Sequence, residues 1–266
     1  MVDWLNIKNK VYVVTGGSSG IGEAVVTALL AQGAKVANFD IQASKDRDEN
    51  LFFVKTDITN QDNVRESVTK ALEHFGKIEG LVNNAGINLP GLLVDPENAN
   101  GPYELNGKVV DKMFNINVKG TFFLTQEIGR ILVKNESGVI VNMSSECGLE
   151  GSEGQSIYAG TKGALNALTR SWAKELAKHN VRVVGVAPGI MEATGLRTLP
   201  YEEALAYTRG KTVEELRAGY DNTSTIPLGR SGKLSEVADL VCYYLSDRAS
   251  YITGVTTNVA GGKTRG

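Results

Sequence analysis

The stretch TGGSSGIG, residues 15–22, decides how this chain folds. It overlaps an apolar run, KVYVVTG (10–16), and opens an amphipathic run, GIGEAVVTALLAQG (20–33). Glycines between a strand and a helix let the backbone turn tightly and approach a pyrophosphate, whose charge the helix N-terminus favours. Taken alone, the same stretch is equally consistent with a plain tight turn, so its meaning depends on the rest of the chain.

The rest of the chain alternates short β-branched runs with longer amphipathic ones. After the first strand at 10–16 and helix at 20–33, strands are predicted at 35–40, 51–58, 78–86, 138–145, 181–189 and 254–262, and helices at 63–76, 107–135, 156–180 and 235–247. Apolar strands alternating with helices are typical of a parallel sheet covered on both faces. We therefore predict an α/β fold, a Rossmann-type doubly wound parallel sheet of about seven strands, in a single domain over residues 1–266.

Two irregular stretches interrupt this alternation. Residues 87–107 hold three of the six prolines and are expected to form a loop, and residues 190–226 contain two expected short helices but no strand. Both follow the carboxyl end of a predicted strand, which is the edge where open parallel sheets bind ligands. Residues 190–226 are therefore either a mobile substrate lid, which we favour, or a passive surface excursion.

Composition and charge exclude several classes of function. The 266 residues are 42% hydrophobic and 22% charged with a net charge of −2, so no basic surface for nucleic acid is expected. No run is long and apolar enough for a membrane span, and the N-terminal residues lack a secretory signal. Two cysteines and two histidines argue against a disulfide framework, a zinc site and a His-based triad. We expect a cytoplasmic protein without a metal.

An acidic residue supports a dinucleotide at the glycine turn. Asp40 ends the second predicted strand, 24 residues beyond Gly16. At this place a carboxylate can accept hydrogen bonds from the hydroxyls of an adenosine ribose. Strand, turn, helix and acid together favour dinucleotide binding over a solvated strand end.

A tyrosine and a lysine near the start of the 156–180 helix suggest acid–base chemistry. Tyr158 and Lys162 are four residues apart and so are neighbours on a helix surface, and Ser145 ends a strand thirteen residues earlier. A free tyrosine has a pKa of about 10, and a nearby ammonium lowers the pKa by favouring the phenolate. The pair therefore predicts a base that removes a hydroxyl proton.

A second pair shows that spacing alone is weak evidence. Tyr207 and Lys211 are also four residues apart, and Thr194 lies thirteen residues before the tyrosine. Position separates the two sets, because Ser145 ends a strand whereas Thr194 lies in an irregular segment. We expect the second pair to lie on the surface.

Six short motifs, in this order, resemble those of the short-chain dehydrogenase/reductase family. They are TGGSSGIG (15–22), VNNAG (82–86), INVKG (116–120), NMSS (142–145), YAGTK (158–162) and APG (187–189). The similarity covers essentially the whole chain. It implies hydride transfer with a nicotinamide dinucleotide, and a homotetramer with the 108–134 and 157–179 helices as contact faces.

The resemblance also implies roles for four residues. Tyr158 would be the acid–base, Lys162 would also hold the nicotinamide ribose, and Ser145 would position the substrate oxygen. Asn117 would complete a water-mediated proton relay. From the residues alone, Asn117 is better explained as a buried helix residue that bonds locally.

The cofactor implied is NAD, because Asp40 would bind the ribose hydroxyls and repel the 2′-phosphate of NADP. The family often places a threonine shortly after the Pro-Gly pair to hold the carboxamide, and Thr194 comes too late for us to expect that contact. The implied dinucleotide contacts are Gly16, Ser18, Ser19, Gly20, Ile21, Gly22, Asp40, Ile41, Asp57, Ile58, Asn84, Ala85, Gly86, Tyr158, Lys162, Pro188, Gly189 and Ile190.

The substrate is suggested by residues 190–226 and by the C-terminal tail. Both resemble family members that oxidise sorbitol 6-phosphate to fructose 6-phosphate with NAD. Expected substrate contacts are Ser145, Glu153 and Glu192 for a polyol and Arg197 for a phosphate, with Lys263 and Arg265 of the tail as further cations. Two alternatives stay open: a 3-oxoacyl-carrier or other carbonyl reductase of the same fold, and, less favoured, a non-catalytic dinucleotide-sensing regulator.

Overall fold

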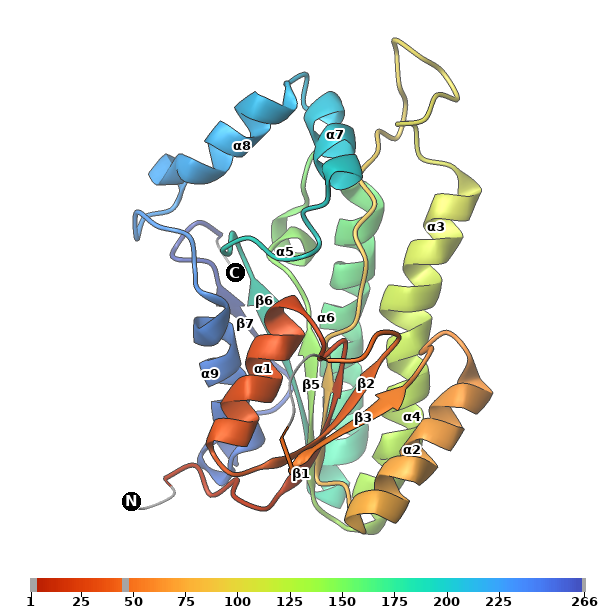
Figure 1. Ribbon diagram of the computed structural model, residues 1–266, viewed down its shortest axis with the longest axis vertical. Helices are drawn as coiled ribbons and strands as arrows, with labels where there is room; N and C mark the ends of the chain where they lie inside the picture. The colour runs from red at the N-terminus through yellow and green to blue at the C-terminus, as the bar shows by residue number, and fades with distance from the viewer. Residues whose placement is uncertain (1–3, 45–47, 265–266) are drawn as a thin grey trace.

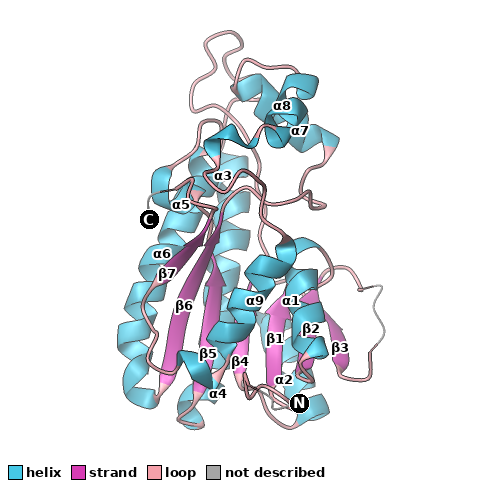
Figure 2. Ribbon diagram, turned by 90° about the vertical axis from the view of Figure 1, so that its left-hand side faces the viewer, coloured by secondary structure: helices cyan, strands magenta, loops and turns pink. Residues whose placement is uncertain are grey.

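The computed structural model describes residues 4–44 and 48–264, and shows a seven-stranded parallel sheet with helices on both faces (Figure 1, Figure 2). The strands lie in the order β3-β2-β1-β4-β5-β6-β7, so the chain winds to one edge from β1 and to the other from β4. This confirms the predicted doubly wound fold. The strands are β1 Val11–Thr15, β2 Lys35–Asp40, β3 Leu51–Lys55, β4 Gly80–Asn83, β5 Gly138–Met143, β6 Val181–Pro188 and β7 Thr256–Val259.

Two apolar cores hold helices against the two faces of the sheet. On one face, α1 (Gly20–Ala31) and α9 (Leu234–Leu245) pack side by side over the central strands. On the other face lie α2 (Gln61–Phe75), α4 (Thr121–Lys134) and α6 (Ser156–Leu176). Val14 is fully buried in the first of these cores and Val13 in the second. Burial of neighbouring strand residues on opposite faces is expected of a sheet that helices cover on both sides.

Some predicted strands are shorter in the structure than expected. The strand predicted at 51–58 stops at Lys55, which pairs with Asp40, the last residue of β2. The strand predicted at 78–86 is reduced to β4, whose residues 80–83 find partners in β1 and β5. The residues beyond each strand are thereby freed to line the carboxyl edge of the sheet.

The long helix predicted at 107–135 is interrupted by a π-helical segment. It consists of α3 (Gly107–Phe114), the π-segment Asn115–Gly120 and α4. Gly120 lies so close to Ile58 that an added Cβ would come within 2.7 Å of the isoleucine side chain. A π-segment inside an α-helix is frequently found at a functional site, and this one carries Asn117.

Residues 190–226 form a small layer beyond the carboxyl edge of the sheet (Figure 1). They hold α7 (Leu199–Thr208) and α8 (Val213–Asp221), as expected, which bury Leu205, Ala206 and Leu216 in a core of their own. We call residues 190–226 the lid segment. Shorter helices are α5 (Cys147–Glu150) and the 3₁₀ turns Ala177–His179, Thr223–Thr225 and Asp247–Ala249.

Among the described residues, no helix combines the length and apolar character needed to cross a membrane. In the same part of the chain, no three His, Cys, Asp or Glu side chains are grouped so that they could hold a metal ion.

Candidate active site

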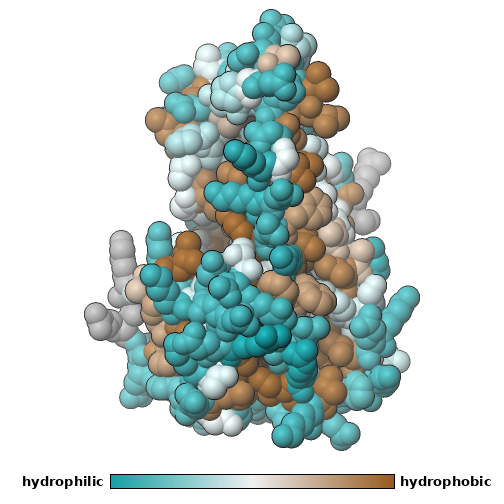
Figure 3. Space-filling model, turned by 90° about the vertical axis from the view of Figure 1, so that its right-hand side faces the viewer, coloured by the Kyte–Doolittle hydropathy of each residue, from teal (hydrophilic) through white to brown (hydrophobic). Residues whose placement is uncertain are grey.

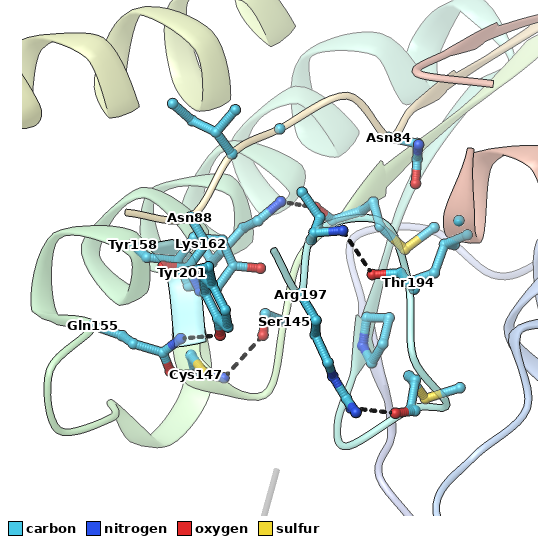
Figure 4. A pocket seen from close by; sticks show the side chains of 18 of the residues that line it. Asn84, Asn88, Ser145, Cys147, Gln155, Tyr158, Lys162, Thr194, Arg197 and Tyr201 are labelled. Carbon is cyan, nitrogen blue, oxygen red and sulfur yellow. Dashed lines mark hydrogen bonds between the residues drawn. The ribbon is translucent and has the colours of Figure 1, made fainter. Parts of the chain in front are cut away.

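A cavity of about 1070 Å³ opens at the carboxyl edge of the sheet, beneath the lid segment. The glycine turn and the ends of β2 and β3 line one part of it, and the ends of β4, β5 and β6 line the middle. Side chains from α6 and the lid segment line the remainder (Figure 4). The cavity therefore joins the predicted dinucleotide site to the predicted catalytic residues.

The glycine turn has the backbone shape that only glycine tolerates well. Gly16 and Gly20 have left-handed φ angles of 64° and 58°. A Cβ on Gly22 would lie 2.0 Å from the carbonyl oxygen of Gly16, so a side chain there would push the turn away from the helix. Gly16, Ser19, Gly20 and Ile21 line the cavity, whereas Ser18 and Gly22 support the turn from behind.

Asp40 ties the glycine turn to the end of β2. One carboxylate oxygen accepts the N–H of Ser18 at 3.0 Å, and the other accepts the N–H of Gln42 at 3.1 Å. Both oxygens keep lone pairs for a ribose, because each carboxylate oxygen accepts more than one hydrogen bond. The neighbouring side chain, Ile41, is 63% exposed and lines the cavity, as do Asp57 and Ile58 after β3.

Asn84 fixes the end of β4 against the glycine turn. Its side-chain amide donates to the carbonyl oxygens of Thr15 and Gly16, at 3.0 and 3.1 Å. Its own backbone N–H and that of Ala85 both donate to the Thr15 hydroxyl. The predicted contacts Asn84, Ala85 and Gly86 therefore line the cavity beside the turn.

The structure brings Ser145, Tyr158 and Lys162 together on the cavity wall. Ser145 follows β5, and the other two lie one turn apart on α6, whose first residue is Ser156. The hydroxyl of Ser145 accepts the N–H of Cys147 at 3.3 Å. The ammonium of Lys162 lies 5.7 Å from the centre of the Tyr158 ring and donates to the carbonyl oxygen of Met143 at 2.7 Å.

Burial governs the pKa values of the tyrosine and the lysine. Burial raises the pKa of Tyr158 well above its ordinary value, and hydrogen bonding to Ser145 opposes this only in part. Burial also lowers the pKa of Lys162 to about 8. Lys162 is not among the groups that lower the pKa of Tyr158 in this geometry, in which its ammonium donates to the Met143 carbonyl.

Asn117 lies behind the cavity wall and holds it in place. The side chain is 1% exposed, accepts the N–H of Ile87 at 2.8 Å and donates to the carbonyl of Ile87 and the hydroxyl of Thr161. A Cβ on Gly86 would lie 3.2 Å from Asn117 Oδ1 and 3.6 Å from Lys162 Nζ. Asn117 thus joins the segment after β4 to α6, close to Lys162.

The tyrosine and the lysine of the second pair, Tyr207 and Lys211, have different surroundings. The Tyr207 hydroxyl donates to Asp95 at 2.8 Å, and its ring packs on Tyr103 at 4.5 Å. Tyr207 does not line the cavity, whereas Lys211 is exposed and does. The pair therefore forms no second acid–base site, although its lysine reaches the cavity.

The remaining predicted contacts are distributed as follows. Pro188, Gly189 and Ile190 line the cavity at the end of β6. Thr194 lines it too, and a Cβ on Gly20 would lie 3.4 Å from its side chain, so the late threonine still reaches the glycine turn.

The predicted substrate contacts are only partly in place. Glu192 lines the cavity and accepts the N–H of Leu234 at 2.8 Å. Arg197 lines it and donates to the Met191 carbonyl at 2.6 Å. Glu153 is exposed and does not line the cavity, so the structure does not support it as a contact.

The tail lies against the residue that follows Ser145. Lys263 pairs with Glu146 at 3.0 Å and with Glu150 at 3.1 Å, and the hydroxyl of Thr264 donates to Glu146 at 2.7 Å. Arg265, the other predicted tail cation, lies outside the described residues.

Among the cavity residues that sequence reasoning missed are Tyr201 and Arg209. Tyr201 accepts the side-chain N–H of Gln155 at 3.0 Å, and burial raises its pKa to about 12. Both residues lie on the lid segment, where no strand fixes which side chains face inward. Only the packing of α7 identifies them.

Comparison with known proteins agrees with this geometry. Residues 10–203 match the family model described as short chain dehydrogenase. The chain is 60% identical to a sorbitol-6-phosphate 2-dehydrogenase of Klebsiella pneumoniae over 100% of both chains. It is 35% identical to a 3-oxoacyl-acyl-carrier-protein reductase of Thermotoga maritima, over 97% of this chain and 99% of the relative.

Solved structures give the same result. A 3-ketoacyl-(acyl-carrier-protein) reductase of Brucella melitensis, complexed with NADH, is similar with a TM-score of 0.82 and 27% identity. The match covers 98% of this chain and 100% of that one. A levodione reductase is similar with a TM-score of 0.83 and 28% identity, over 97% and 98% of the two chains.

Proposed function

The chain belongs to the short-chain dehydrogenase family, and we propose that it oxidises sorbitol 6-phosphate to fructose 6-phosphate with NAD. It is an oxidoreductase that acts on a CH–OH group. The observation that carries the proposed substrate is the 60% identity, over the full length, to a relative named for this activity. Ser145, Tyr158 and Lys162 in one cavity support the chemistry.

The described residues fit a nicotinamide dinucleotide. Ser19, Gly20 and Ile21 bring the N-terminus of α1 to the cavity for the pyrophosphate, and Asp40 offers a carboxylate to the adenosine ribose. Pro188, Gly189 and Ile190 would lie by the nicotinamide. The bound dinucleotide would supply the acceptor for the hydride.

The protein's own groups handle the proton of the substrate hydroxyl. Ser145 donates a hydrogen bond that holds the substrate oxygen, and Tyr158 removes its proton. Lys162 holds the nicotinamide ribose and favours the phenolate when its ammonium turns from the Met143 carbonyl toward Tyr158. Asn117 supports the proton relay from behind the wall.

The other end of the cavity suits a phosphorylated polyol. Glu192 and Ser145 offer acceptors and donors to hydroxyl groups, and Arg197 offers a guanidinium whose planar fork matches a phosphate. The lid segment carries Arg197 and would close over the substrate. Lys263 already pairs with two carboxylates, so we assign it to holding the tail in place.

The proposed substrate is tested by following NAD reduction with a panel of sugar-alcohol phosphates and the matching free polyols. We expect sorbitol 6-phosphate to have the highest kcat/KM, and fructose 6-phosphate to be reduced by NADH in the reverse direction. Turnover of an acyl-carrier substrate, with none of the polyol phosphates oxidised, would refute the proposal.

A preference for NAD over NADP is expected from Asp40. Its carboxylate would repel a 2′-phosphate, and Ile41 beside it supplies no cation. We expect kcat/KM for NAD to exceed that for NADP. Asp40→Ser should reduce the ratio of the two kcat/KM values by about tenfold or more, as expected for the loss of a charged contact. Ser18→Ala on the same turn is the control. A wild-type preference for NADP would contradict the assignment, and would direct attention to Lys45 and Arg47, which lie outside the described residues.

The alternative functions are less well supported. A 3-oxoacyl-carrier reductase is favoured only by relatives of lower identity, 35% against 60%. A non-catalytic regulator would not need Ser145, Tyr158 and Lys162 on one wall.

The location and assembly of the protein are further parts of the proposal. We propose a cytoplasmic homotetramer with contacts through α3, α4 and α6. Apolar side chains interrupt the polar surface on the side of the molecule that carries α2, α3 and α4 (Figure 3), and Phe114 and Phe122 are 39% and 40% exposed. Light scattering of the purified protein measures the number of subunits.

A further inference from the structure

Three cations on the cavity wall form no ion pair with a carboxylate that the structure describes. Besides the catalytic lysine, the cavity lining includes Arg197, Arg209, Lys211 and Lys263. Lys263 is paired with two glutamates. Among the side chains that the structure describes, none of the other three cations forms an ion pair. Cations that line a cavity without a carboxylate partner are suited to an anionic ligand.

Arg209 and Lys211 stand on either side of the turn that ends α7. Gly210 between them has a left-handed φ of 59°, and the N–H of Lys211 donates to the Ala206 carbonyl at 3.0 Å, which closes the turn. The guanidinium of Arg209 donates to the hydroxyl of Ser152 over 3.4 Å. A long bond to a neutral hydroxyl leaves most of the five guanidinium donors available.

Hydrogen bonds connect Arg209 to the start of the catalytic helix. The hydroxyl of Ser152, which Arg209 contacts, donates to Gln155 Oε1 at 2.8 Å, and Gln155 Nε2 donates to the Tyr201 hydroxyl at 3.0 Å. Gln155 directly precedes α6 and lies three residues before Tyr158. This chain fixes Arg209 relative to the acid–base while keeping it at the lid side of the cavity.

Arg197 belongs to the same group of charges. Its guanidinium stacks on the Tyr220 ring at 4.0 Å. Burial raises the pKa of Tyr220, whereas Arg197 and Arg209 both lower it, so both positive charges act on this one ring. Glu202, the carboxylate that also acts on Tyr220, accepts two bonds from Arg217 at 3.0 and 2.7 Å and is not available to neutralise them.

We propose that Arg209 and Lys211, together with Arg197, bind the phosphate of the substrate. This rests on the proposed function, because it names the phosphate-binding groups of that same site. Arg209 offers paired N–H donors in the planar arrangement that matches phosphate oxygens. Lys211, on the other side of the same turn, adds a second positive charge. The polyol then extends from this end of the cavity toward Ser145.

The test compares Arg209→Gln with wild type on sorbitol 6-phosphate and on free sorbitol at saturating NAD. We expect the ratio of the two kcat/KM values to fall about 10–100-fold, and to recover in part in Arg209→Lys, since one charge-assisted contact is lost. Lys211→Gln should lower the ratio by a smaller factor. The Ki of inorganic phosphate, as a competitor of sorbitol 6-phosphate, should rise by a similar factor in Arg209→Gln.

Arg217→Gln is the matched control, because it removes a lid cation that does not line the cavity. A loosened lid, as Arg217→Gln would give, should lower kcat/KM equally on sorbitol 6-phosphate and on free sorbitol. The proposal would be overturned if Arg209→Gln gave such equal losses. It would also be overturned if Arg209→Gln left both the kcat/KM ratio and the Ki of phosphate unchanged. If wild type does not oxidise sorbitol 6-phosphate, the proposed function fails. Calorimetric titration with inorganic phosphate then tests the phosphate site independently of the reaction. Phosphate binding by wild type that is lost in Arg209→Gln supports the site, and no phosphate binding by wild type rejects it.

Discussion

Tyr158→Phe should lower kcat by about 10²–10⁴-fold, the range that a general acid–base group contributes. The substitution removes the phenol oxygen that we propose accepts the substrate proton, and it keeps the ring that packs beneath Lys162. NADH affinity should therefore change little. Stopped-flow or steady-state NAD reduction measures kcat, and fluorescence titration measures NADH binding.

Tyr207→Phe is the matched control, because Tyr207 also lies four residues before a lysine but does not itself line the cavity. The Tyr207 hydroxyl bonds Asp95, and its loss should leave kcat close to wild type. Near-normal turnover in Tyr158→Phe would show that another group takes the proton. A comparable loss in both variants would point to folding of the lid segment rather than to chemistry.

The fold was predictable because each part of the sequence agrees with it. The periodicity of apolar residues gave all seven strands and the main helices, and the glycine turn gave the point where the first crossover begins. The errors lie at strand ends, where pairing with a neighbour sets the limit. β3 ends at Lys55, which pairs with Asp40, the last residue of β2.

The π-segment was not predictable from local sequence. NINVKG (115–120) lies within a helical pattern, and nothing in its composition signals an extra residue in one turn. The close approach of Gly120 to Ile58, which belongs to a distant part of the chain, accompanies the change. Tertiary contacts of this kind lie beyond periodicity.

In the candidate site, too, some features follow from the sequence and others depend on tertiary contacts. Ser145, Tyr158 and Lys162 lie on regular elements, so their convergence follows from the order of the strands. The direction of the Lys162 ammonium depends on which carbonyl oxygen it donates to, and only the structure identifies that oxygen as the one of Met143. Arg209 lies on the lid segment, where Glu202 of α7 pairs with Arg217 of α8, and the sequence carries no local sign of that pairing.

Lys162→Met should abolish most turnover and also change how the stability of the protein depends on pH. The lysine is 4% exposed, and burial lowers its pKa from 10.5 to about 8. Below pH 8 the ammonium is charged in both the folded and the unfolded protein, so the folded state bears the cost of burying it. Above about pH 10.5 the amine is neutral in both states and that cost disappears.

The sign follows from proton binding. Between pH 8 and pH 10.5 the unfolded state binds more protons at Lys162 than the folded state, so this residue makes wild type more stable as the pH rises. Integrated over the shift, the effect is roughly 3 kcal/mol, as an order of magnitude. Methionine has no proton to bind, so the difference between wild type and the variant follows the titration of Lys162, including that of its hydrogen bond to the Met143 carbonyl.

The measurement is the free energy of unfolding in urea for wild type and Lys162→Met at several pH values from 7 to 10. We expect the stability of wild type relative to the variant to increase with pH, because other titrating groups cancel in the difference. Lys174→Met, on the same helix but not buried, is the control and should show no such trend. A difference that is flat with pH would mean that the Lys162 ammonium is stabilised as well in the fold as in water, and that the active site does not hold it at a cost.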